Sequence, residues 1–138
     1  MKDAELEDYG VYEGDFSFRQ YKITLKTRTS SPEAFIEFYL NSSSTSKIAD
    51  KEYTYSYYYS NSGTFTSIKT AMNVEWENEL SVGGIFYYEN KLDQNYNNTI
   101  TVTTEGDNKA FDIDLKYISN GDTVNVKAYY EGTLTQVN

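Results

Sequence analysis

The chain of 138 residues contains neither cysteine nor histidine. Without cysteine it can form no disulfide, no thiolate metal site and no cysteine nucleophile. Without histidine it lacks the usual general base, the usual zinc ligand and the usual partner of a catalytic serine. An enzyme made from this chain would depend on carboxylates, lysine or tyrosine. We therefore expect a protein with no catalytic role, no bound metal and no cofactor.

Basic residues are also scarce, because 12 Lys and Arg stand against 21 Asp and Glu and leave a net charge of −9. Phosphate backbones require a basic face, so we expect no nucleic-acid partner. No apolar run approaches the roughly 18 residues of a membrane-spanning helix, so we expect no transmembrane segment. The opening residues MKDAELED lack the apolar stretch of a signal peptide, and we expect no leader there.

Aliphatic side chains are few as well, since Leu, Ile, Val and Phe together make up about a fifth of the chain. The 15 tyrosines offset this shortage. Each can bury a large ring while its hydroxyl reaches water or a partner, so we expect a thin core with many hydroxyls at its rim. The length is that of one domain. We expect an acidic, flexible N-terminal segment over residues 1–10 and a single β domain over 11–138.

Alternation of apolar and polar residues predicts strands along most of the chain. It is clear in YKITLKT and AFIEFYL, although Phe35 and Tyr39 make the polar face of the second segment unusually aromatic. At the C-terminus TITVTT, KAFDIDLKY and VNVKAYYEG predict three antiparallel strands, with an Asn120-Gly121 hairpin turn between the last two. Roughly seven to nine strands predict an all-β fold, a single antiparallel β-sandwich, with a small closed lipocalin-like barrel as the alternative.

Two segments are less regular. Residues 68–80 favour either a short helix or a strand, since Met72, Val74 and Trp76 also alternate. The helical spacing is found at Ile68, Met72, Trp76 and Leu80. Residues 89–98 are polar and rich in asparagine, so they predict a loop.

The stretch EYTYSYYYSNSG, residues 52–63, places four tyrosines at every second position. Four exposed rings would form a larger apolar patch than soluble monomers usually leave uncovered. We therefore expect one face to be a wall of the core and Tyr58 to lie on the outer face. The inward set is Tyr53, Tyr55, Tyr57 and Tyr59.

Several of these segments together resemble a known family. The likeness lies in VYEGDF, QYKITLKT, AFIEFYL and IADKEYTYS, followed by a closing meander from TITVTT to YYEGTL. In this order they resemble the small, mostly uncharacterised β-sandwich lipoproteins exported by Bacteroidetes. Members of that group share a fold more than any known activity. The resemblance implies a secreted or surface-anchored protein of the cell envelope.

The same resemblance bears on the N-terminus. KDAELED looks like the acidic stretch that follows the lipidated cysteine in those lipoproteins, which implies a lipid anchor on the native N-terminus. The cysteine itself is not in the sequence. An ordinary acidic, disordered end is the alternative interpretation.

Two acidic patterns match spacings found in catalytic and calcium-binding sites. Asp112 and Asp114 share one strand face about 6.6 Å apart, near the carboxylate spacing of glycoside hydrolases, although solvent-facing aspartates beside a lysine also keep a sheet soluble. Residues 93–104 begin with the D-x-N-x-N spacing of a calcium loop. Asn98 then replaces the required glycine and Thr104 the bidentate glutamate. We expect a solvated strand face and a polar loop, respectively.

Three aromatic residues in or beside the irregular segments are the candidate binding residues: Trp76, Tyr88 and Tyr96. Exposed rings there could stack on sugars or on a partner protein, or could plug the ends of a sandwich. We expect a non-catalytic binding or adhesion module with a glycan or protein partner. The alternatives are a carbohydrate-binding module, a lipocalin-like carrier of a small apolar ligand and, less favoured, a carboxylate-only glycosidase.

Overall fold

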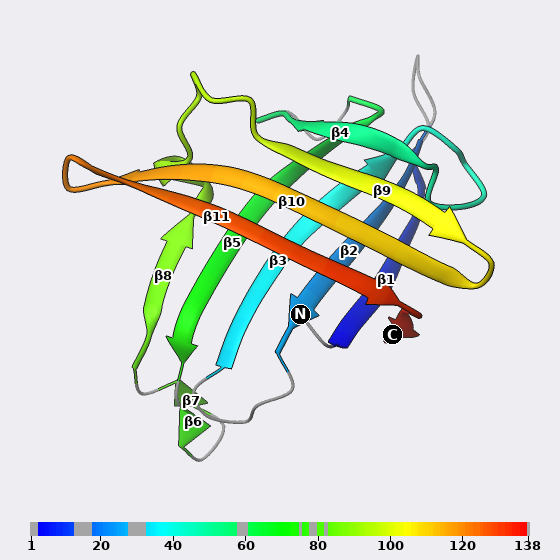
Figure 1. The fold of residues 1–138 in the computed structure, drawn as a ribbon. Helices are drawn as coiled ribbons and strands as arrows, with labels where there is room; N and C mark the ends of the chain where they lie inside the picture. The colour runs from blue at the N-terminus through cyan, green and yellow to red at the C-terminus, as the bar shows by residue number, and fades with distance from the viewer. Residues whose placement is uncertain are drawn as a thin grey trace.

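The computed structural model describes residues 3–12, 18–27, 33–57, 61–74, 76–77, 80–81 and 83–137 (Figure 1). These residues form twelve strands and one 3-10 helix, η1 (Glu89–Lys91), and contain no α-helix. The strands are β1 (Asp3–Tyr12), β2 (Phe18–Lys26), β3 (Glu33–Ser42), β4 (Lys51–Tyr55), β5 (Thr64–Val74), β6 (Trp76–Glu77), β7 (Leu80–Ser81), β8 (Ile85–Tyr88), β9 (Thr99–Glu105), β10 (Asn108–Ser119), β11 (Asp122–Gly132) and β12 (Thr135–Gln136). The all-β class predicted from the sequence is confirmed.

Ten strands belong to one mixed sheet, in the order β11-β10-β9-β4-β5-β3-β2-β1-β12, with β8 also paired to β5. The sheet curls strongly into a half barrel. Figure 1 shows β9, β10 and β11, the front layer, crossing over β1, β2, β3, β5 and β8, the back layer. A two-sheet sandwich is not confirmed, because β4 joins both layers into one continuous sheet.

The core lies between the two layers and is filled by side chains from both. The ring of Phe38 in β3 meets that of Phe111 in β10 edge-on, with centroids 6.2 Å apart. Thr70 in β5 and Tyr117 in β10 share a buried hydrogen bond of 2.9 Å. Burial raises the pKa of Tyr117 to about 12. Because each layer covers the other, neither has a complete core by itself.

Two β-bulges bend β5 at the centre of the back layer. Relative to β3, one extra residue of β5 lies between the Glu33 and Phe35 positions and another between Glu37 and Tyr39. Asn73 and Ser67, in these two segments, have positive φ values of 56° and 53°. Bulges increase local twist and bend a strand, and the sheet curls here.

The same bulges explain why residues 68–80 resembled a helix. Each extra residue shifts the inward-facing phase, so burial in β5 departs from strict alternation. Ile68 and Val74 are buried, Met72 is half-buried, and the segment is strand up to Val74. The helical alternative was therefore wrong.

The C-terminal meander follows the sequence prediction closely. β9, β10 and β11 pair antiparallel in one uninterrupted register. Asn120 and Gly121 have φ values of 53° and 83°, the positive values that their turn requires. Apolar and polar residues alternate strictly along these strands, so the sequence predicted this part of the fold correctly.

The expected flexible N-terminal segment requires correction, since Asp3–Tyr12 forms β1 and pairs with β2. Ala4 is buried and Leu6 packs against the core, while Glu5 on the opposite face pairs with Lys26. The acidic composition had concealed this alternation. The β domain thus includes residues that were expected to precede it.

The tyrosine stretch is only partly a core wall. Tyr53 is fully buried and its hydroxyl donates to the carbonyl of Ala49 at 2.6 Å, while Tyr55 is half-buried and donates to Glu89 at 2.5 Å. Tyr57 is 72% exposed, which corrects the prediction that it faces inward. Strand β4 ends at Tyr55, so the alternation no longer applies beyond it. Tyr58 and Tyr59 lie outside the described residues.

The chain finally passes from one edge of the sheet to the other. β11 is the edge strand on one side of the sheet. After two connecting residues, β12 begins at the opposite edge and pairs parallel with β1. Residues 132–135 therefore bring the two edges together at one corner of the half barrel. Across the described ranges, no helix is long and apolar enough to span a membrane.

Candidate binding site

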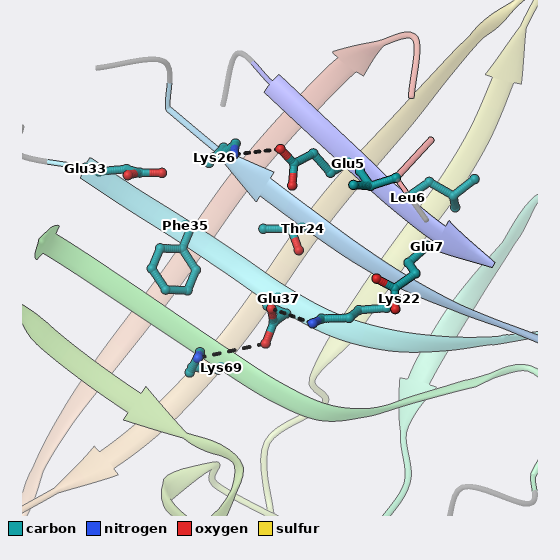
Figure 2. A pocket seen from close by; sticks show the side chains of 11 residues that line it. Glu5, Leu6, Glu7, Lys22, Thr24, Lys26, Glu33, Phe35, Glu37 and Lys69 are labelled. Atoms are coloured by element: carbon teal, nitrogen blue, oxygen red, sulfur yellow. Dashed lines mark hydrogen bonds and ion pairs between the residues drawn. The ribbon is translucent and has the colours of Figure 1, made fainter. Parts of the chain in front are cut away.

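A groove of about 360 Å³ runs along the outer face of the back layer, the face turned away from the core. We call it the outer groove (Figure 2). Strand alternation places charged residues of β1, β2, β3 and β5 there, opposite the buried positions. Its lining is Glu5, Leu6, Glu7, Lys22, Thr24, Lys26, Glu33, Phe35, Glu37, Lys69 and Val137.

Charges of opposite sign alternate across the strands of the groove. Lys26 contacts Glu5 at 2.7 Å, and Glu37 lies between Lys22 at 3.3 Å and Lys69 at 3.9 Å. The hydrogen bond to Glu5 raises the pKa of Lys26 and outweighs its partial burial. Figure 2 shows these contacts as two separate groups, one joining β1 and β2 and the other joining β2, β3 and β5. The floor thus offers ordered donors and acceptors rather than a field of one sign.

A second, more open hollow of about 650 Å³ adjoins the groove and shares Glu37 and Lys69 with it. We call it the adjoining hollow. It extends the surface toward β8 and η1. Its other lining residues are Tyr39, Ser67, Ile68, Tyr88, Glu89 and Asn90.

Aromatic rings border both depressions. Tyr88 is 53% exposed and stacks on Phe86, with centroids 6.2 Å apart and planes 14° apart. Phe86 meets Phe35 edge-on at 6.4 Å, and the ammonium of Lys69 lies 5.4 Å from the Phe35 ring centre. These mutual contacts hold the rings in fixed orientations. The Tyr88 side chain would therefore lose little conformational entropy when a ligand stacks on it.

A further pair of rings, Tyr9 and Tyr39, lies beside the adjoining hollow, which Tyr39 helps to line. The β1 bulge between Asp8 and Gly10 projects Tyr9 outward, and its ring lies 5.4 Å from that of Tyr39. Their hydroxyls are 3.5 Å apart. The carboxylate of Glu7, and then Tyr39, raises the pKa of Tyr9, so the Tyr9 phenol stays protonated at ordinary pH.

The structure places the three candidate residues apart. Tyr88 lines the adjoining hollow. Trp76 begins the small β6–β7 pair, beyond the end of β5. Tyr88 instead pairs with Lys69, five residues before the end of β5. The Trp76 side chain lies outside the described part of the structure. Tyr96 lies in the loop before β9. They do not form one joint platform.

Tyr96 is fixed by contacts with the outer face of the front layer. Its hydroxyl donates to Asp114 at 2.7 Å, and the ammonium of Lys116 lies 5.5 Å from its ring centre. With Tyr55, Asn98 and neighbouring residues it lines a cavity of about 120 Å³. That volume suits a few waters rather than a sugar ring.

The loop compared with a calcium site is organised by its own hydrogen bonds. A carboxylate oxygen of Asp93 accepts the backbone N–H of Asn95 at 3.0 Å. The amide group of Asn98 donates to the carbonyls of Asp93 and Tyr96, and its oxygen accepts from the N–H of Lys116. In the described part of the chain no three acidic side chains gather in a metal-binding cluster. These asparagine and aspartate groups shape the loop and fasten it to β10.

Asp112 and Asp114 share the outer face of β10, as their spacing predicted. Asp112 is exposed opposite Tyr129, and Asp114 lies opposite Lys127. Neither lines the outer groove or the adjoining hollow. Asp112 thus lies on a solvated sheet face, whereas Asp114 is half-buried beneath the Tyr96 hydroxyl.

Sequence reasoning missed most of the outer surface. Phe35, Glu37 and Tyr39 share one face of β3, and the unusual aromatic content of that face was the available signal. Nothing in the sequence placed β8 beside β5, which brings Tyr88 next to them.

No family model matches the chain, and neither a curated protein nor a solved structure is significantly similar to it. Function must therefore be inferred from the geometry of the chain's own residues.

Proposed function

We propose that the protein is a non-catalytic binding module that recognises a glycan on the outer face of its back layer. The observation that supports it is the shared border of the outer groove and the adjoining hollow. There the exposed ring of Tyr88 stands beside Glu37 and Lys69, with Tyr39 on the same surface. In keeping with the family resemblance, we propose that the module acts at the cell envelope, secreted or surface-anchored.

The chemistry of a sugar ring suits this surface. One side of a pyranose is a flat array of C–H groups that can lie on an aromatic face. Its hydroxyls both donate and accept, so they can hydrogen-bond to a carboxylate and an ammonium together. Glu37 and Lys69 provide these two groups 3.9 Å apart. The paired charges favour a neutral or weakly charged saccharide.

Support for the other functions is weaker. A carrier of small apolar ligands needs an interior cavity, but rings such as Phe38 and Phe111 meet at the centre of the half barrel. A carboxylate-only glycosidase would use Asp112 and Asp114, but Asp112 lies exposed on a sheet face and Asp114 accepts the Tyr96 hydroxyl. A protein partner would use the same outer surface and is therefore the main alternative to a glycan.

Glycan-array binding tests the proposal. We expect the wild-type protein to bind a defined set of glycans, and Tyr88→Ala or Glu37→Gln to weaken that binding at least tenfold, as lost stacking and charged hydrogen bonds predict. Tyr57→Ala is the control, because it removes a tyrosine ring that is even more exposed than Tyr88 and lies outside both depressions. Trp76→Ala tests the alternative end of the molecule.

Two results would contradict the proposal. One is the absence of binding to any glycan by correctly folded wild-type protein. The other is binding that survives Tyr88→Ala but disappears in Trp76→Ala, which would move the site to the β6–β7 end.

A further inference from the structure

Strand β11 ends the sheet, and of the described strands only β10 pairs with it (Figure 1). Its 11 residues keep one register with β10 from Asp122 to Gly132, without a bulge. In an antiparallel strand every second residue directs its backbone N–H and C=O away from its partner. Between Thr123 and Ala128, β11 therefore presents a regular row of backbone groups to another strand.

The other edges of the sheet are better protected. β12 has two residues and β8 has four. β1 contains a bulge between Asp8 and Gly10, and β12 covers part of it. Soluble proteins usually protect an edge by such shortness or bulges, by proline, by charged side chains such as lysine on the edge, or by inward-pointing charge.

Of these devices β11 has only a solvent-facing lysine, Lys127. It contains no proline and no bulge, and its core-facing positions in the middle of the strand are apolar. Val124, Val126 and Ala128 pack on the core yet remain half-buried, because none of the described strands lies beyond β11 in the sheet. A strand paired to this edge would cover all three.

We propose that β11 pairs antiparallel with β11 of a second copy of this chain, with the twofold axis at Val126. The apolar stripe is its own complement in this register. Val126 lies opposite its equivalent, Val124 opposite Ala128, and Asn125 opposite Lys127. Such an isologous contact buries the same surface on both copies and closes the edge. It joins two half barrels through one continuous sheet.

Charge disfavours one of the two neighbouring registers. With the axis one residue later, Lys127 would face its own equivalent, and like charges directly opposite destabilise a strand pair. With the axis at Val126, each Lys127 faces an uncharged Asn125. Both side chains point to solvent, on the face opposite the core.

Asn125 provides a test in both directions. Asn125→Lys places a lysine against Lys127 twice per dimer, and Asn125→Glu creates two ion pairs. From cross-strand pair energies we expect the dimer Kd to rise roughly tenfold in the first variant and to fall roughly tenfold in the second. The control variants are Thr103→Lys and Thr103→Glu, at an exposed position of the interior strand β9.

Sedimentation equilibrium over a wide concentration range gives the Kd, and hydrogen exchange locates the contact. We expect a concentration-dependent dimer, opposite shifts of the two Asn125 variants, no shift of the Thr103 controls, and amides of residues 122–130 that lose protection on dilution. A monomer at every concentration would overturn the inference. So would a dimer whose Kd is the same in both Asn125 variants, because another surface would then form it.

Discussion

The two layers of the half barrel present different outer faces. The front layer alternates threonine, aspartate and lysine along unbroken strands, and its exposed carboxylates lie on a solvated surface. The back layer has paired charges too, but they line a groove bordered by aromatic rings. On both faces charged residues lie opposite buried ones, so this pattern alone does not explain the difference.

Bulges explain it. The front-layer registers contain no shift, whereas β1 has one bulge and β5 has two. A bulge bends its strand and redirects the neighbouring side chains. The β1 bulge projects Tyr9 onto Tyr39. Ser67 lies in one of the β5 bulges and lines the adjoining hollow. Irregular pairing therefore coincides with the candidate binding surface.

The largest expected effect tests whether the layers depend on each other. Phe38→Ala in the back layer and Phe111→Ala in the front layer each leave a cavity at the shared core, so each should lower the free energy of unfolding by about 3–5 kcal/mol. Urea unfolding followed by circular dichroism measures both.

The double variant sharpens this test. Because the two rings touch, its loss should differ from the sum of the single losses by about 0.5–3 kcal/mol. Simple additivity, or a separate transition for each layer, would mean that the layers fold independently.

The front layer was predictable from sequence because its period stays at two residues from Thr99 to Gly132. The two bulges of β5 break that period, and Ser67 and Asn73 give little local warning. Strand order was equally hidden: β4 lies between β9 and β5 through tertiary pairing. For the site, the shared face of Phe35 and Tyr39 was visible, but its neighbours depended on that order.

At the corner joining the layers, Tyr53 and Tyr57 offer a matched comparison of buried and exposed rings. Tyr53→Ala removes a fully buried ring and should cost about 3 kcal/mol or more. Tyr57→Ala removes a ring that is 72% exposed and should cost less than about 1 kcal/mol. Equal losses in denaturant unfolding would contradict the assignment of Tyr57 to the surface.

A pH titration tests the hydrogen bond between the layers. The pKa of Tyr117 rises from 10.0 to about 12 on folding, mainly through burial. Below pH 10 both states are protonated and stability is unaffected. Between pH 10 and 12 the unfolded chain loses the proton first, so stability falls as pH rises, by about 3 kcal/mol in total for this group.

Tyr117→Phe isolates that contribution from those of the other tyrosines. The variant loses the hydrogen bond to Thr70 at every pH, which should cost about 1 kcal/mol at pH 7. Its stability should then decline less steeply than that of the wild type between pH 10 and 12. Parallel curves over that range would show that Tyr117 does not titrate as its burial requires.

The smallest expected effect compares the charges of the two outer faces directly. Glu37 contacts Lys22 and Lys69, whereas the Asp114 carboxylate accepts the Tyr96 hydroxyl. Glu37→Gln should therefore lower stability by about 0.5–1 kcal/mol at low salt, as partly exposed ion pairs usually do. Asp114→Asn keeps an oxygen that can accept from Tyr96, so it should cost less than about 0.5 kcal/mol.

At 1 M salt the screening length is only about 3 Å, and the loss in Glu37→Gln should shrink toward that of Asp114→Asn. Urea unfolding at both salt concentrations decides. A loss in Glu37→Gln that persists unchanged at high salt would mean that packing, rather than paired charge, holds the groove together.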